Sequence, residues 1–209
     1  MKKNNLICSV KSLVILPTMV VSIIFPSTDN VKISQNVLIQ KFNIEANRNI
    51  ALNQAIDLEA TKDKARAEAI DAYLKARNMP LDGFGMKMVI EAKKNDLDWR
   101  LLPAIAIRES TGGKFACKKS PANSFGWGSC KISFDSNEEA IETVARNLGG
   151  NEPKTDHHYA GKNTKQILQK YNPPSVVPKY ADQVMSIMES IGEENLGETD
   201  TNIEINTNT

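Results

Sequence analysis

The sequence has almost no excess of charge of either sign. Its 209 residues carry 26 Lys and Arg against 25 Asp and Glu, a formal net charge of +1. Such a chain has no overall field that would recruit nucleic acid or acidic polymers in general, so we expect no nucleic-acid partner. The length favours one core domain with appendages over two full domains, and no internal repeat is visible.

The sequence also lacks an apolar run long enough to cross a bilayer. The longest such run, residues 13–25, follows Lys2, Lys3 and Lys11. As a helix it would span about 20 Å, whereas the hydrocarbon core is about 30 Å thick. Basic residues before a short apolar stretch are typical of a secretory signal. No A-x-A cleavage site follows, so we expect residues 1–30 to be a signal peptide or a retained membrane anchor, and the protein to be exported to the cell envelope or beyond.

Cysteine is scarce, with three in the chain. Cys8 lies upstream of the apolar run, which is the wrong side for a lipid-modified cysteine. Cys117 and Cys130 could pair outside the cytoplasm, where closing their loop would add about 3 kcal/mol of stability; in a reducing compartment they would be free thiols. Two cysteines and the His157–His158 pair lack the spacing of a zinc-ligand set. We expect no metal or cofactor, and surface positions for both histidines.

One long helix is predicted before the main domain. Residues 44–78 contain no Gly or Pro, and alanines recur at helical spacing. A helix of this length would reach about 50 Å. It is either a spacer or coiled coil that holds the domain away from a membrane, or a solvated helix that packs on the domain. We expect residues 31–43 to form a short connector before this helix.

The remainder predicts a small, mainly α domain over residues 80–191, followed by a disordered acidic tail, residues 192–209. Helices are expected over residues 85–95, 98–109, 136–148, 164–170 and 178–191. Asp98 is expected to cap the second of them, whose start Pro103 should bend or tighten. Ser136 and Glu139 have the spacing of a capping box. Residues 131–134 alternate enough for a strand or hairpin edge.

Glu109 is the first candidate for chemistry. It follows Leu102, Ile105 and Ala106 at the spacing of one helical face, just before Thr111 and two glycines end the helix. A carboxyl group on an apolar face loses hydration, which disfavours its charged form. In a cleft it would stay protonated near neutral pH and could donate a proton to a leaving oxygen. Alternatively, it bends into solvent or pairs with a neighbouring cation.

Three features occur in chain order: Glu109–Ser110 at a helix end, the loop N-S-F-G-W-G at residues 123–128, and Tyr171–Asn172 before the final helix. Together they resemble the lysozyme-like superfamily of peptidoglycan-cleaving enzymes. The resemblance is closest to the endo-β-N-acetylglucosaminidase branch, with the soluble lytic transglycosylases as relatives. It covers roughly residues 80–191 and implies a lysozyme-like helical catalytic domain with at most a short hairpin.

The resemblance also implies a site. Glu109 matches the catalytic acid, and Tyr171 matches the tyrosine that lines the cleft opposite it and would orient the sugar or donate to it. The residues expected to bind substrate are Ser110, Asn123, Ser124, Phe125, Gly126, Trp127, Gly128 and Asn172. Glycines let backbone approach a saccharide closely, and aromatic rings offer flat apolar faces to sugar rings. For Phe125 and Trp127, ordinary core filling is the alternative.

The sequence departs from its relatives in two ways. Where lytic transglycosylases carry G-L-M-Q after the acid, this chain has F-G-W-G at residues 125–128. No second carboxylate is obvious, and Asp135, Glu138 and Glu139 are the nearest candidates. Two-carboxylate hydrolysis needs a partner at a set separation; without one, the N-acetyl group of the substrate is the natural nucleophile.

The sequence thus predicts an exported or envelope-anchored glycosidase that acts on the glycan strands of peptidoglycan. A membrane is a second partner if the N-terminal segment is not cleaved. The alternatives are a lytic transglycosylase, a non-catalytic wall-binding module of the same fold, and a purely structural helical envelope protein.

Overall fold

The computed structural model describes residues 29–194, and the chain divides into two units, residues 1–50 and 51–209. The signal peptide or anchor predicted for residues 1–30 therefore lies outside the described residues, apart from its last two positions. Most of the predicted tail lies outside them too. Within residues 29–194, no helix combines the length and the apolar character that a membrane crossing needs.

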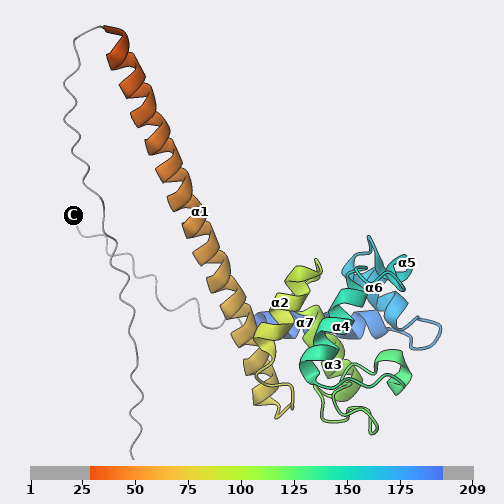
Figure 1. Ribbon diagram of the computed structural model, residues 1–209. Helices are drawn as coiled ribbons and strands as arrows, with labels where there is room; N and C mark the ends of the chain where they lie inside the picture. The colour runs from red at the N-terminus through yellow and green to blue at the C-terminus, as the bar shows by residue number, and fades with distance from the viewer. Residues whose placement is uncertain (1–28, 195–209) are drawn as a thin grey trace, which may run out of the picture. The chain divides into compact units, whose positions relative to one another are not determined.

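The described residues are mainly helical and contain no strand (Figure 1). This confirms the mainly α class. The elements in chain order are α1 (Asp29–Ala76), α2 (Gly85–Lys94), α3 (Leu101–Ser110), a short 3-10 helix η1 (Trp127–Cys130), α4 (Asn137–Leu148), α5 (Asp156–Tyr159), α6 (Thr164–Tyr171) and α7 (Tyr180–Glu194). The last helix thus extends three residues, Gly192 to Glu194, into the segment predicted as a tail.

The strand edge predicted for residues 131–134 is wrong. These residues form a turn and irregular backbone. The carbonyl of Ile132 accepts a hydrogen bond from the side chain of Asn123 at 3.0 Å, where a strand would pair with a neighbouring strand. The partial alternation of the sequence therefore reflects a loop held from inside by a side chain.

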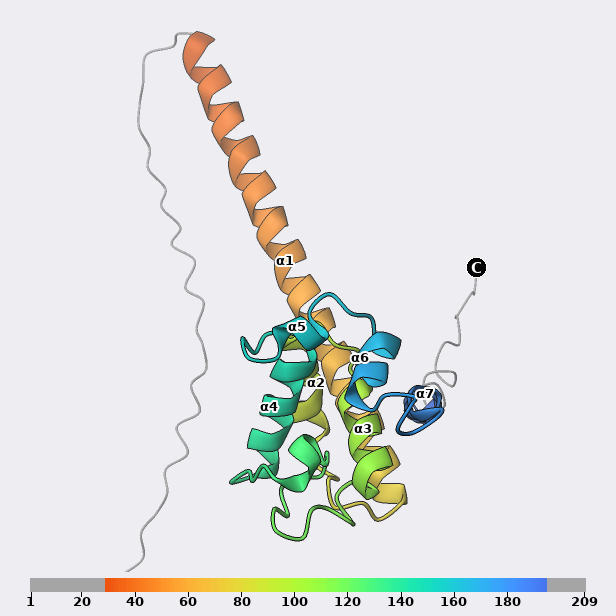
Figure 2. The ribbon, with the colours of Figure 1, turned by 90° about the vertical axis from the view of Figure 1, so that its right-hand side faces the viewer.

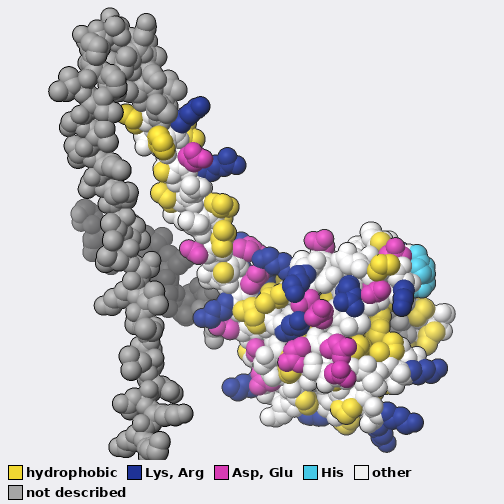
Figure 3. Space-filling model, viewed as in Figure 1, with side chains coloured by type: hydrophobic (Ala, Val, Ile, Leu, Met, Phe, Trp, Pro, Cys, Tyr) yellow, Lys and Arg dark blue, Asp and Glu magenta, His cyan; other side chains and the backbone are white. Residues whose placement is uncertain are grey.

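Helix α1 changes character along its length. It includes residues 31–43, which we expected to form a connector. Its large apolar side chains between residues 39 and 58 are exposed: Ile39, Phe42, Ile44, Ile50, Leu52, Ile56 and Leu58 (Figure 3). Near its C-terminal end, Ala67, Ile70, Tyr73 and Leu74 are buried in the core of the second unit. The core of the domain therefore begins before residue 80.

Helix α3 is the central element of the second unit, where it contacts α2, α4 and α7 (Figure 2). The six residues from Leu101 to Ala106 are all buried. Because α3 begins at Leu101, Pro103 lies in the first turn, where its missing N–H costs no intrahelical bond. Asp98 accepts a hydrogen bond from the Arg100 N–H at 2.9 Å and forms a salt bridge with the Arg100 side chain. It thus fixes the residue before the helix and does not cap the helix itself, contrary to prediction.

The cap of α4 also differs in detail from the prediction. Ser136 accepts from the Glu139 N–H at 3.2 Å, as expected. The Glu139 carboxylate reaches one residue further back and accepts from the Asp135 N–H at 2.6 Å. Glu139 is thereby committed to the start of this helix.

Glu91 gives stability that depends on pH. It is 2% exposed and lies 2.7 Å from Lys94 Nζ and 3.0 Å from Lys87 Nζ. Burial alone would raise the pKa of Glu91, but the hydrogen bonds from Lys94 and Lys87 together outweigh it and hold the pKa below its ordinary value of 4.5. A carboxylate with a lowered folded-state pKa stabilises the protein above its unfolded pKa, and this contribution is lost as the pH falls through the folded value.

Glu91→Gln should therefore lower the free energy of unfolding by about 1–3 kcal/mol at pH 7, because two lysines lose their buried partner. The loss should shrink towards pH 3. Urea denaturation at both pH values measures this. Glu68→Gln is the control, since the Glu68 side chain is 67% exposed in its pair with Lys64 and should change stability by less than about 0.5 kcal/mol. An equal loss at both pH values would contradict the assignment.

Candidate active site

A cavity of about 630 Å³ opens in the second unit at the C-terminal end of α3. Its size suits a ligand of several sugar rings, since small-molecule sites span about 300–1,000 Å³. The lining comes from α3, η1, α5, the end of α6 and the α6–α7 connection: Glu109, Gly126, Trp127, Gly128, Ser129, Thr155, His158, Tyr159, Tyr171, Asn172, Pro173 and Val176. Segments far apart in the sequence thus meet at Glu109.

Glu109 presents two differently placed carboxylate oxygens. It is half-buried in the last turn of α3, which ends at Thr111 in a left-handed backbone conformation. Its Oε1 accepts a hydrogen bond from the Tyr180 hydroxyl at 2.6 Å. Its Oε2 lies beside Gly126, on which a Cβ would stand 3.1 Å away from this oxygen. One oxygen is therefore fixed by the protein, and the other lies at the cavity wall.

Gly126 is required at this wall on two grounds. Its φ is +62°, a conformation that side chains with a Cβ rarely adopt. Any Cβ would also crowd Glu109 Oε2. Backbone therefore borders the carboxylate where a larger residue would cover it.

Tyr180 is a residue of the candidate site that sequence reasoning missed. The sequence pattern places it only within the last predicted helix, residues 178–191, and the structure buries it, with 2% of its surface exposed. Burial, and then the hydrogen bond to Glu109, raise the pKa of Tyr180 far above its ordinary value. Its hydroxyl therefore stays protonated and can donate to the carboxylate. Sequence reasoning could have found it from its chemistry: a tyrosine on a buried helix face needs a hydrogen-bond partner for its hydroxyl, whereas a phenylalanine does not.

Tyr180→Phe should slow any cleavage that depends on Glu109 by about 100-fold, the cost of misplacing a catalytic group by about 1 Å. The free energy of unfolding should fall by only about 1 kcal/mol. Rates on a glycan substrate and urea denaturation measure the two effects separately. The control is Tyr73→Phe, since Tyr73 is another buried tyrosine, on α1. A Tyr180→Phe rate equal to wild type would remove the positioning role.

Aromatic rings line the cavity around Glu109. The ring centroids of Trp127 and Tyr171 are 5.7 Å apart, and those of Trp127 and Tyr159 are 6.4 Å apart. Tyr171 stacks on Tyr180 with a centroid separation of 6.0 Å and an interplanar angle of 9°. These contacts link Tyr180, which binds Glu109, to the rings of the cavity wall. The ring faces are apolar surfaces of the kind that sugar rings pack against.

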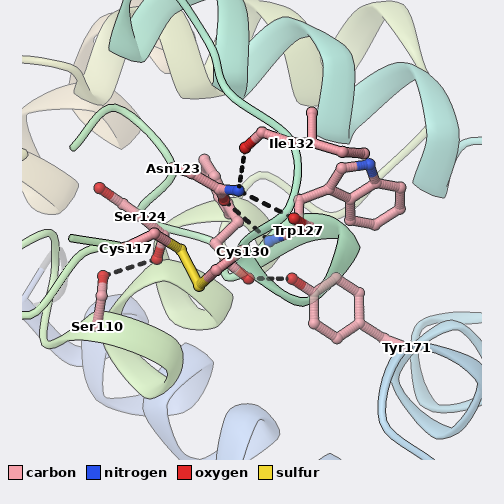
Figure 4. The surroundings of a disulfide bond; sticks show 9 residues. Ser110, Cys117, Asn123, Ser124, Trp127, Cys130, Ile132 and Tyr171 are labelled. Atoms are coloured by element: carbon pink, nitrogen blue, oxygen red, sulfur yellow. Dashed lines mark hydrogen bonds between the residues drawn. A yellow bond between two sulfur atoms is a disulfide. The ribbon is translucent and has the colours of Figure 1, made fainter. Parts of the chain in front are cut away.

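Tyr171 reaches the cavity with its ring, but its hydroxyl is already engaged. The hydroxyl donates to the backbone carbonyl of Phe125 (Figure 4). Burial, followed by the charge of Glu109, raises the pKa of Tyr171 well above its ordinary value. The hydroxyl therefore fastens the loop that carries Phe125, and the predicted roles of Tyr171, to orient the sugar or to donate to the oxocarbenium-like state, stay predictions.

Four residues predicted to bind substrate are buried behind the cavity wall. Ser110, Asn123, Ser124 and Phe125 are each at most 3% exposed, and none of them lines the cavity. The Ser110 hydroxyl lies 2.6 Å from the Ser124 carbonyl and accepts from the Gly113 N–H at 2.9 Å. Phe125 fills the core. These residues shape the wall, whereas Gly126, Trp127, Gly128 and Asn172 line the cavity.

Asn123 organises the loop from its centre (Figure 4). It is fully buried. Its Nδ2 donates to the carbonyls of Trp127 at 2.9 Å and Ile132 at 3.0 Å, and its Oδ1 accepts from the Trp127 N–H at 2.9 Å. The position of Trp127 in the cavity therefore depends on one side-chain amide.

Cys117 and Cys130 form a disulfide, with their Cα atoms 5.6 Å apart (Figure 4). The bond closes the loop that contains Asn123 and the cavity residues from Gly126 to Ser129. Of the two alternatives that the sequence left open, a disulfide or two free thiols, the structure has the disulfide.

Breaking this disulfide should lower the free energy of unfolding by about 3 kcal/mol, the chain-entropy value for a loop of this size. The double variant Cys117→Ser/Cys130→Ser and reduction of the wild type should agree. Urea denaturation with and without dithiothreitol measures the effect. Reductant should leave the double variant unchanged, and an unaltered wild type in reductant would contradict a stabilising role.

Glu109 is the sole carboxylate that lines this cavity within the described part of the chain. Asp135, Glu138 and Glu139 do not line it. No group of three or more His, Cys, Asp or Glu among the described residues could hold a metal ion. The site as described therefore offers one acid, its tyrosine partner and aromatic walls.

The histidine pair is placed differently from the prediction. Both residues belong to the short helix α5. His157 is exposed, but His158 is half-buried and lines the cavity. Desolvation, and then the positive charges of His157 and two lysines, lower the pKa of His158. The lowered pKa favours the neutral imidazole of His158 at the cavity wall.

Within residues 29–194, the fold is mainly helical, and the aromatic-lined cleft contains one carboxylate, that of Glu109. Comparisons of the chain with protein-family models, with curated proteins and with solved structures found no match. The resemblance to the lysozyme-like superfamily thus rests on the residues themselves.

Proposed function

We propose that the protein cleaves the glycan strands of peptidoglycan, as an endo-acting β-1,4-glycosidase of the glucosaminidase type, with Glu109 as its general acid. One observation carries the proposal: Glu109 lies at the wall of an aromatic-lined cavity with Oε1 held by Tyr180 and Oε2 beside Gly126. The order of the Glu-Ser, Phe-Gly and Tyr-Asn motifs supports it.

In this proposal, Glu109 gives its proton to the glycosidic oxygen as the bond from that oxygen to the anomeric carbon breaks. Tyr180 keeps Oε1 in place and stabilises the carboxylate that proton transfer leaves behind. Trp127, Tyr159 and Tyr171 hold the sugar rings against the cavity wall. The positive charge that develops on the sugar ring needs a nucleophile on its opposite face.

Glu109 is the one carboxylate that the described residues place in the lining, and this favours the acetamido group of the substrate as that nucleophile. Its carbonyl oxygen would attack the anomeric carbon and form a cyclic oxazolinium ion. Glu109, now ionised, would then take a proton from the group that opens this ion. If that group is water, the product is a free reducing end.

The same observation favours a lytic transglycosylase as the second candidate. There the sugar's own 6-hydroxyl would open the ion and give a 1,6-anhydro sugar. Mass spectrometry of purified peptidoglycan digested by the full chain decides between the two. A free reducing end supports hydrolysis, a 1,6-anhydro end supports transglycosylation, and intact glycan strands would contradict both.

A further inference from the structure

The loop between α3 and the start of α4 has a charge unlike the rest of the chain. This loop, residues 111–136, contains four lysines and one acidic residue, Asp135, whereas the whole chain is nearly neutral. The four are Lys114, Lys118, Lys119 and Lys131, and all are exposed. The positive charge is therefore concentrated in one segment.

The disulfide gathers these residues at one end of the domain. It joins Cys117 to Cys130 and so holds the segment around Phe115 close to the segment around Ile132. Figures 1 and 2 both draw this loop beyond the ends of α3 and α4, and Figure 3 shows Lys and Arg side chains projecting from the domain at that end. We call Lys114, Phe115, Lys118, Lys119, Lys131 and Ile132 the basic tip.

The basic tip exposes apolar side chains on a fixed backbone. Phe115 is 74% exposed, the highest value among the large apolar residues of the described chain, and Ile132 is 41% exposed. The Phe115 N–H nevertheless donates to the Ser110 carbonyl at 2.8 Å, at the end of α3. The fold thus presents this ring outward in spite of the cost of its hydration.

Among the described residues, the lysines of the basic tip have no charged partner. Elsewhere, Lys87, Lys93, Lys94 and Lys165 form ion pairs with carboxylates. None of the four tip lysines forms an ion pair with any residue between 29 and 194. Their charge is available to an external anion.

We propose that the basic tip docks on the surface of an anionic lipid bilayer, with Phe115 inserted among the lipids and the lysines at the headgroups. Charge alone would suit any polyanion, but a soluble anionic polymer offers no apolar phase to an exposed phenylalanine. At a bilayer surface, basic residues bind the anionic headgroups while an apolar side chain among them enters the acyl-chain region. This contact is independent of residues 1–30 and of the proposed cleavage.

Docking would also orient the cleft. Gly128 and Ser129 line the cavity and belong to the loop that the disulfide closes. The cavity would therefore be held close to the bilayer, on the side of the domain that carries the basic tip.

The test places a fluorophore at the contact in the full chain. The tryptophan fluorescence of the Phe115→Trp variant should shift to shorter wavelength when vesicles of phosphatidylglycerol and phosphatidylcholine are added. Brominated lipids in these vesicles should quench it. Vesicles of phosphatidylcholine alone should give neither effect. Wild type supplies the background of Trp99 and Trp127. Because this readout is local to residue 115, membrane insertion of another segment cannot imitate it.

Adding Lys114→Gln, Lys118→Gln and Lys119→Gln to Phe115→Trp should weaken the vesicle-dependent signal about a hundredfold, since each basic residue at an anionic surface contributes about fivefold. The matched control adds Lys62→Gln, Lys75→Gln and Lys162→Gln, which removes the same charge from exposed lysines outside the tip and should leave the signal unchanged. Equal losses in the two triple variants would overturn the proposal. So would emission from the Phe115→Trp variant that brominated anionic vesicles leave unquenched.

Discussion

Glu109→Gln should abolish the release of soluble glycan fragments from purified peptidoglycan. Loss of a general acid lowers rates by about 10²–10⁴-fold, and no other carboxylate among residues 29–194 lines this cleft to replace Glu109. The amide oxygen of glutamine can still accept the hydrogen bond from Tyr180, so the cavity should keep its shape. Fragment release by wild type and variant, with sedimentation of each protein bound to the insoluble wall, measures the effect.

Glu138→Gln is the matched control. Glu138 was a sequence candidate for a second carboxylate, but it is exposed and outside the cavity, so its variant should release fragments as wild type does. Undiminished release by Glu109→Gln would show that Glu109 is not the acid. If wild type releases nothing but both proteins bind the wall, the chain is a binding module; if neither binds, the structural alternative gains support.

Asn123→Ala should destabilise the protein and also damage the cleft. The substitution leaves the Trp127 N–H and two backbone carbonyls inside the protein without their partner. Because each unsatisfied buried group costs about 1–3 kcal/mol, a loss of about 3 kcal/mol is expected. Trp127 should then lose its fixed position, and cleavage should fall at temperatures where the protein is still folded.

Asn95→Ala separates these two effects. Asn95 is a buried asparagine whose amide donates to the Glu91 carbonyl at 2.8 Å and whose Oδ1 accepts from Asn151, and it does not line the cavity with Glu109. It should lower the melting temperature while leaving cleavage by the folded fraction intact. Equal loss of cleavage in both variants would assign the effect of Asn123 to stability alone. Circular dichroism melts and rates below the lower transition give the comparison.

The helical part of the fold could be predicted from sequence because its signals are local. The Ser136 cap and the apolar stripe that follows it specify α4, and Thr111 with two glycines ends α3 next to Glu109. Local signals do not report which segment lies against a helix end. Residues 131–134 alternate like a strand, but the side chain of Asn123 takes the hydrogen bond of Ile132.

The candidate site could be predicted only in part, because local motifs mark its residues but do not show which segments meet in the fold. Glu109 and the loop at residues 126–128 were indicated by the motif order and meet at the cavity. Tyr180 lies 71 residues after Glu109, and only the packing of α7 on α3 brings its hydroxyl to the carboxylate. Ser110 and Asn123 are motif residues too, but their polar atoms bind backbone inside the loop. A motif shows which residues matter without showing which of them face the ligand.

The most direct test is the structure of Glu109→Gln bound to an oligosaccharide of β-1,4-linked N-acetylglucosamine. We predict sugar rings against Trp127 and Tyr171, with one glycosidic oxygen within about 3 Å of the side chain of residue 109, the distance that proton transfer needs. The acetamido group of the sugar on the cleaved side should lie below its anomeric carbon. An oligosaccharide bound elsewhere, or bound in the cavity with every glycosidic oxygen out of reach of residue 109, would contradict the account.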